Sequence, residues 1–174
     1  MNKKVSMLFL LGFLLWVIGA AFSYFLYTPN PVLKLPPLSK NVNLVFDFKF
    51  HLFAKIFFNN ALVGLLVSII GFATGGILTA ILFVYNGFML GFIIQNALYL
   101  KMSKLSLAHS LLLHGPLEVV SLLYLGAIGF QGWTFYKMLL KNEMKFEFAQ
   151  LPHLKTFILP FSGLLLAAII EASI

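Results

Sequence analysis

Three ionisable side chains interrupt otherwise apolar stretches of this chain: His114, Glu118 and Glu171. In a continuous helix, His114 and Glu118 are four residues apart and lie on the same face. One histidine and two carboxylates could ligate a zinc ion that activates water, or they could relay a proton. Because an unpaired charge at membrane depth costs at least about 2.5 kcal/mol, we expect the three side chains to lie within hydrogen-bond or single-water reach.

The same residues also have structural explanations. If Pro116 begins a new helix, Glu118 lies in its first turn, where a carboxylate complements the helix dipole. His114 could hydrogen-bond the carbonyl that Pro116 leaves without a donor, and Glu171 could rest in water near the chain end. A His-x3-Glu pair is common by chance, so we assign neither a metal nor a cofactor. Whether His114, Glu118 and Glu171 are catalytic, and whether the chain is an enzyme, stays open.

Other polar residues and several glycines also lie in apolar stretches, where polar groups are costly and glycines let helices approach closely. Gly87 and Gly91 have the Gly-xxx-Gly spacing, as have Gly71 and Gly75. We interpret this spacing as tight packing inside one subunit, with a dimer face as the alternative. The candidates for polar contacts or helix packing are Asn59, Asn60, Asn86, Gly87, Gly91, Gly115 and Pro116.

Composition predicts that a lipid bilayer is the solvent of these segments. Hydrophobic residues make up 61% of the 174 residues and charged residues only 10%, and the mean hydropathy is +0.99. A soluble domain with so few charges would aggregate. The net charge of +7 comes from 12 lysines without arginine, spread between the apolar runs, which indicates anchoring to anionic headgroups and argues against nucleic acid as a partner. Without cysteine, thiol catalysis is excluded.

The apolar runs predict an all-α, polytopic membrane bundle of about five transmembrane helices, forming a single domain over residues 1–174. Residues 44–58 mix Asp, Lys and His with phenylalanines, which favours a separate amphipathic segment in the headgroup plane. The predicted helices span residues 5–27, 60–83, 88–100 or longer, 106–136 with a kink at 116, and 154–172.

Three connections follow from the same pattern. The forty uncharged residues from Ala61 to Leu100 are about twice one crossing and must turn once, and Asn86-Gly87 is the predicted turn. Four prolines between residues 28 and 43 predict an extended loop, and the charged residues between 137 and 155 predict a solvated loop or a surface helix. A cleavable signal peptide ending near Gly19-Ala20-Ala21 is the alternative for the first helix.

Orientation is not decided by the number of lysines, because five crossings place six on each side. We predict a cytoplasmic N-terminus, since Lys3 and Lys4 directly precede the first helix and early charges usually dominate the bias. The sequence contains no Walker-type phosphate loop, no Gly-x-Ser-x-Gly elbow and no His-Glu-x-x-His motif. This chain therefore does not hydrolyse ATP.

Five short motifs occur in order along the chain from Asn59 onward: Asn59-Asn60, Asn86-Gly87-x3-Gly91, His114-Gly115-x2-Glu118, the small-residue string from Gly126 to Gly132, and Leu166-Ala167-Ala168-Ile169-Ile170-Glu171. In these motifs and their order, the chain resembles the stage II sporulation protein M family over almost all of its length from Asn59 onward. It differs from the family in having Leu113 where a Pro-His-Gly pattern is common, and it ends three residues after Glu171.

The resemblance implies a multi-pass protein of the bacterial cell membrane. One branch of the family acts in sporulation engulfment with peptidoglycan-remodelling partners, and another is encoded with circular bacteriocin systems beside an ABC-type ATPase. His-Gly-x2-Glu and the compact chain make this sequence more similar to the second branch. We expect a membrane subunit of a peptide maturation and export complex that handles a hydrophobic bacteriocin precursor with a separate ABC-type ATPase and other membrane subunits. The alternatives are an intramembrane hydrolase or peptide-ligating enzyme using the His/Glu residues, and an engulfment scaffold.

Overall fold

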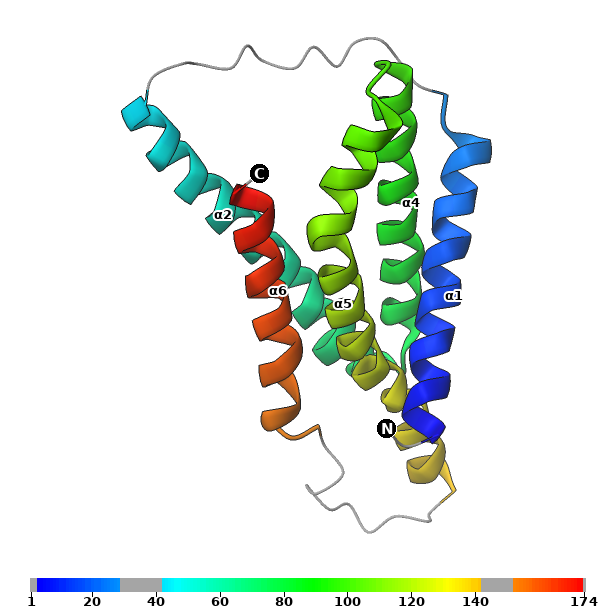
Figure 1. Cartoon of the computed structure of the whole chain (residues 1–174). Helices are drawn as coiled ribbons and strands as arrows, with labels where there is room; N and C mark the ends of the chain where they lie inside the picture. Colours follow the sequence, from blue (N-terminus) through cyan, green and yellow to red (C-terminus); the bar gives the residue numbers. More distant parts are fainter. Residues whose placement is uncertain (1–2, 29–41, 142–151, 174) are drawn as a thin grey trace.

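The computed structural model describes residues 3–28, 42–141 and 152–173 (Figure 1). Five helical stretches are long and apolar enough to cross a bilayer, so the predicted all-α membrane bundle is confirmed. The elements are α1 (Lys3–Leu26), α2 (Val42–Leu65), a π-helical turn η1 (Leu66–Ile70), α3 (Gly71–Ala73), α4 (Ile77–Tyr99), α5 (Lys104–Leu140) and α6 (Lys155–Ser173).

The spans alternate in direction along the bundle. The start of α1 lies at one end, and the end of α6 lies toward the other (Figure 1). Helix α1 packs along α4, and α5 lies against α6, α1 and the η1–α3 region. Helix α2 runs obliquely and contacts α6. The helix α5, which carries His114 and Glu118, thus occupies the centre of the bundle.

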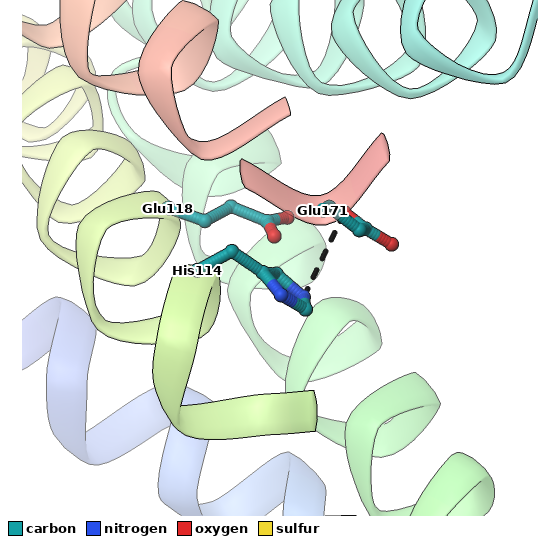
Figure 2. A group of neighbouring side chains, drawn as sticks. All are labelled: His114, Glu118 and Glu171. Carbon is teal, nitrogen blue, oxygen red and sulfur yellow. Dashed lines mark ion pairs between the residues drawn. The ribbon is translucent and has the colours of Figure 1, made fainter. Parts of the chain in front are cut away.

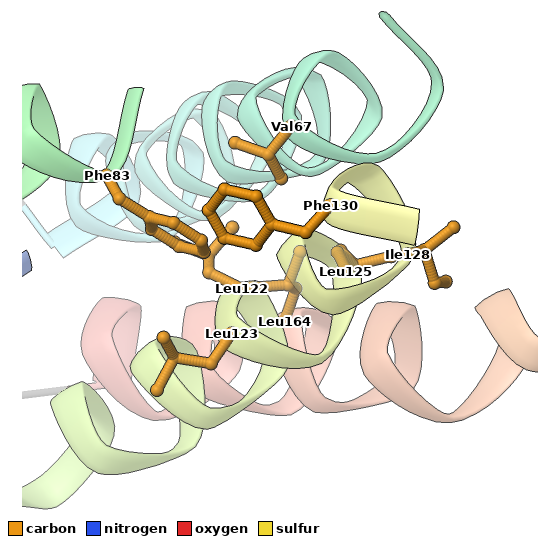
Figure 3. Packing of buried hydrophobic residues seen from close by; sticks show 8 residues of the cluster. All are labelled: Val67, Phe83, Leu122, Leu123, Leu125, Ile128, Phe130 and Leu164. Carbon is orange, nitrogen blue, oxygen red and sulfur yellow. The ribbon is translucent and has the colours of Figure 1, made fainter. Parts of the chain in front are cut away.

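The core is apolar and comes from η1, α4, α5 and α6 (Figure 3). Leu125 of α5 and Leu164 of α6 are completely buried, and Phe83 of α4 is nearly so. The outward surface is apolar as well, with Leu10 and Ile81 more than half exposed. Apolar side chains on both sides of a helix are expected when lipid replaces water as the solvent.

Small residues allow α1 and α4 to approach closely. A methyl group added at Gly87 would overlap the carbonyl oxygen of Trp16, and one added at Gly91 would overlap the hydroxyl of Ser23. Gly19 faces the backbone of Val84 in the same way. The Gly87/Gly91 spacing therefore serves packing inside one subunit, as predicted. Gly19, which the signal-peptide alternative treated as part of a cleavage site, has a packing role in the bundle.

The turn predicted at Asn86-Gly87 is wrong. The long uncharged run does turn once, but at residues 74–76, and α4 continues through Asn86. Gly75 and Gly76 have φ values of +64° and +89°, a region that favours glycine. The Gly76 N–H donates to the Gly71 carbonyl at 2.7 Å, the six-to-one bond of a helix C-terminus. The predicted boundaries 60–83 and 88–100 are accordingly wrong. The crossing before the turn ends with α3, and the crossing after it is the whole of α4.

The separate interfacial segment at residues 44–58 is also wrong. Helix α2 is continuous from Val42 to Leu65, and the membrane-spanning stretch runs from Lys49 to Ala73. An in-plane helix needs one clean apolar stripe, whereas the phenylalanines of α2 are divided between the bundle and its outside: Phe53 and Phe57 are partly buried, and Phe50 and Phe58 are exposed. The charge at the start of this span is accommodated because the Lys49 ammonium donates to the Ser173 carbonyl at 3.3 Å.

Helix α5 is uninterrupted from Lys104 to Leu140 and contains Pro116. The predicted helix over 106–136 is confirmed and extended, and no new helix begins at Pro116. The kink at 116 stays a prediction. The predicted helices 5–27 and 154–172 are confirmed as α1 and α6 to within two residues. The four prolines of the first predicted loop and residues 142–151 of the second lie outside the described residues.

This arrangement makes the topology testable. With five crossings and a cytoplasmic N-terminus, a reporter fused after Glu171 should be extracytoplasmic, and one inserted at Gly75-Gly76 should be cytoplasmic. Paired alkaline phosphatase and green fluorescent protein fusions would measure both positions. A cytoplasmic signal at the C-terminal fusion, with the N-terminus also cytoplasmic, would contradict the five-crossing topology.

Candidate functional site

His114, Glu118 and Glu171 meet between α5 and α6 (Figure 2). One possible ligand atom from each residue lies within 4.8 Å of those of the other two. The Nε2 atom of His114 is 3.7 Å from Oε2 of Glu171. Residues 57 positions apart in the sequence are thereby combined into one polar cluster, which we call the His/Glu cluster.

The antiparallel contact between α5 and α6 brings these side chains together. Gly163 of α6 lies directly against Ser121 of α5, where an added methyl group would overlap the Ser121 hydroxyl. From this contact, Glu171 lies eight residues forward on α6 and His114 lies seven residues back on α5. At 1.5 Å per residue both are about 11 Å from the contact, which places them at the same level.

The His/Glu cluster is polar and incompletely satisfied. It contains two carboxylates and one histidine, and His114 and Glu171 have side-chain exposures of 13% and 36%. The Nδ1 atom of His114 is buried without a hydrogen-bond partner among the described residues. The nearby ammonium of Lys49 donates instead to the Ser173 carbonyl. The cluster therefore combines excess negative charge with partial access from outside the bundle.

The buried hydroxyl groups of the bundle are different, because each donates to a backbone carbonyl of a helix. The four are Ser23 to Ala20, Ser68 to Gly64, Thr79 to Val67 and Ser121 to Leu117, at 2.6 to 2.9 Å. Such bonds satisfy the polar group and stabilise packing. An open set of side chains, as in the His/Glu cluster, is more typical of a site that binds something.

The geometry removes two of the structural explanations. Glu118 lies well inside α5, so it does not cap the first turn of a helix that starts at Pro116. His114 makes no hydrogen bond to the carbonyl of Leu112, since Nδ1 has no described partner and Nε2 faces Glu171. The remaining chemistry is that of a His/Glu/Glu group: one water can bridge it, a proton can pass along it, or a metal can bind there.

The other predicted site residues lie elsewhere. Asn59 and Asn60 hydrogen-bond each other at 3.5 Å, about 15 Å along α2 from Lys49 and hence far from the His/Glu cluster. The Asn86 amide donates to the Leu82 carbonyl of its own helix at 2.8 Å. A methyl group at Gly115 would meet no described atom within 4 Å, so Gly115 is not a close-packing position.

Sequence reasoning did not single out two residues that shape the site. Gly163 allows α6 to lie close to α5. The only feature of the sequence that could have indicated this role is a lone glycine inside an apolar helix. Lys49 ties the start of the α2 span to the end of α6 beside Glu171. No local pattern indicates this second contact, since the bond goes to a backbone carbonyl that any residue could supply.

Comparison with known proteins places the chain in a family. No curated protein and no solved structure matches it. The model of the family described as stage II sporulation protein M matches residues 5–174. This match spans all five helices and the three residues of the His/Glu cluster. With nearly the whole sequence matched, the chain belongs to the stage II sporulation protein M family.

Proposed function

We propose that this protein is the membrane subunit of a peptide maturation and export complex that handles a hydrophobic circular bacteriocin precursor. A separate ABC-type ATPase supplies the energy. One observation carries the proposal: the only described group of three His, Asp or Glu residues close enough to act together is reachable from outside the bundle and bordered by exposed apolar side chains.

The surroundings of the His/Glu cluster fit an apolar peptide. On α5, Leu113 and Leu117 are adjacent to His114 and Glu118 in the sequence and are 44% and 37% exposed. Apolar side chains of a precursor can pack on these residues, while its polar groups hydrogen-bond the His/Glu cluster. Charge-assisted hydrogen bonds of this kind are about twice as strong as neutral ones.

The need for a separate energy source follows from the sequence. ATPases of the ABC type hold the phosphates of ATP with a glycine-rich loop that carries a lysine and a hydroxyl residue, and this sequence has no such loop. The described residues are almost entirely in helices. An ABC-type partner can couple ATP hydrolysis to movement of the peptide, while this subunit provides contacts within the bilayer.

Co-expression provides the test. Purified alone, the protein should show no ATPase activity, and it should co-purify with an ABC-type ATPase when both are expressed. An unrelated multi-pass membrane protein carrying the same tag is the control for non-specific capture. Stable binding of peptidoglycan enzymes without the ATPase would contradict the proposal and favour an engulfment scaffold.

A second candidate function is an intramembrane hydrolase or peptide-ligating enzyme. The observation that favours it is the convergence of one histidine and two carboxylates within 4.8 Å. In the same experiment, cleavage or ring closure of the precursor by this protein alone, without the ATPase, would support the enzyme and contradict a purely non-catalytic role.

A further inference from the structure

We propose that the His/Glu cluster is a binding site for a divalent transition metal of the zinc type, with His114, Glu118 and Glu171 as its three protein ligands. This inference goes beyond the role of the protein as a complex subunit. The fourth position is open to water or to a substrate group, as in zinc sites with three protein ligands.

The distances suit such a site after small side-chain adjustments. Ligand atoms of the three residues lie within 4.8 Å of one another. A tetrahedral zinc ion with bonds of about 2.0 to 2.2 Å holds its ligand atoms roughly 3.4 Å apart. Glutamate and histidine side chains can close that difference by rotation about their side-chain bonds, without movement of α5 or α6. The backbone positions are held by the contact between Gly163 and Ser121.

Charge balance gives a second, independent reason. Two carboxylates at membrane depth repel each other and are costly unless a cation compensates them. Among the described residues, Glu171 forms an ion pair with His114 and no ion pair is formed by Glu118, while the ammonium of Lys49 bonds to the Ser173 carbonyl. A divalent cation would balance both carboxylates with a neutral histidine as the third ligand.

The donor set selects the class of metal. Calcium and magnesium prefer all-oxygen sites, whereas imidazole nitrogen together with carboxylate oxygen suits zinc and its neighbours. The buried Nδ1 of His114 has no described hydrogen-bond partner, so no competing protein contact fixes the ring. Either ring nitrogen can therefore turn to the metal. The 36% exposure of the Glu171 side chain provides a path for the ion to enter.

The chain offers a matched control for variants of this site. His109 lies on the same helix, five residues before His114, and is exposed. It is not part of the His/Glu cluster. His109→Ala therefore removes an imidazole from α5 without touching the proposed ligands, and it reports any adventitious binding by exposed histidines.

Metal titration of the full-length protein tests the proposal. The protein would be purified in detergent through a tag without histidine, stripped with a chelator and titrated with Zn²⁺ and, in parallel, Co²⁺. We expect about one Zn²⁺ per chain, and a visible Co²⁺ spectrum of four-coordinate type. His114→Ala, Glu118→Gln and Glu171→Gln should each weaken binding by more than the 10- to 100-fold typical of a lost outer-shell partner. His109→Ala should bind like the wild type.

The wild-type titration decides the question even where a variant does not fold. Absence of stoichiometric Zn²⁺ binding by the folded wild type would overturn the proposal. Equal binding by the wild type and by folded Glu118→Gln would do so as well, as would loss of binding in His109→Ala alone. Co-purification with the ATPase is measured separately, so failure of the metal site leaves the proposed function to its own test.

Discussion

Gly87→Ala should separate α1 from α4 and destabilise the bundle strongly. The added methyl group would overlap the Trp16 carbonyl oxygen and lie 3.0 Å from the Ala20 backbone nitrogen. Both are backbone atoms of α1, so no side chain can rotate away and the whole helix must shift. Overpacking of a close contact costs about 1 to 3 kcal/mol, and we expect the upper end of that range. Thermal unfolding in detergent would measure the change.

Gly115→Ala is the matched control for this prediction. Both glycines lie inside transmembrane helices, but a methyl group at Gly115 would meet no described atom within 4 Å. Alanine is the better helix former, so Gly115→Ala should leave stability unchanged or raise it by up to about 1 kcal/mol. Equal unfolding temperatures for the two variants would show that the close approach of α1 and α4 is not needed.

Glu118→Gln should nearly abolish production of mature peptide while the protein still accumulates in the membrane. Glutamine keeps the shape and hydrogen-bonding capacity of glutamate but lacks its charge. Glu118 is one of only two carboxylates in the His/Glu cluster. A hydrogen bond from the precursor to a charged carboxylate would contribute about 1.5 to 3 kcal/mol, so a variant that cannot form this bond should give at least about tenfold less mature peptide. Mature peptide would be measured by mass spectrometry and protein level by immunoblotting.

The double variant His114→Ala, Glu118→Gln gives the decisive comparison, because it removes two of the three members of the cluster. His109→Ala, on an exposed position of the same helix, serves as the control and should produce peptide normally. Normal production by the double variant would leave only a structural role for the cluster. Loss of production together with loss of protein from the membrane would point to folding and contradict a direct role.

Positions of the membrane helices were largely predictable from the sequence. Bilayer thickness sets the length of an apolar crossing, so α1 and α6 are predicted to within two residues. The turn was not predictable in the same way, because the uncharged run offers both Asn86-Gly87 and Gly75-Gly76. Conformation decides between them: residues 75 and 76 have positive φ, while Gly87 is needed for contact with α1.

The prediction of a separate interfacial segment was wrong for a related reason. Charged residues among phenylalanines indicate an environment between water and lipid, but they do not say whether a helix lies in the interface or enters from it. In the structure, the candidate membrane span of this helix starts at Lys49, so the helix runs from the interface into the bilayer. The Lys49 ammonium bonds to the end of α6. That contact depends on where two distant helices end, and no local sequence pattern encodes it.

The candidate site, too, was predictable from the sequence only in part. By itself, the sequence determined that this is a membrane protein, that His114, Glu118 and Glu171 are costly where they stand, and that His114 and Glu118 share a helix face. Only the tertiary structure decided that Glu171 joins them and that Pro116 leaves α5 continuous. The physical reason is that helix periodicity fixes neighbours four residues apart, whereas the register of α6 on α5 depends on packing such as that of Gly163 against Ser121.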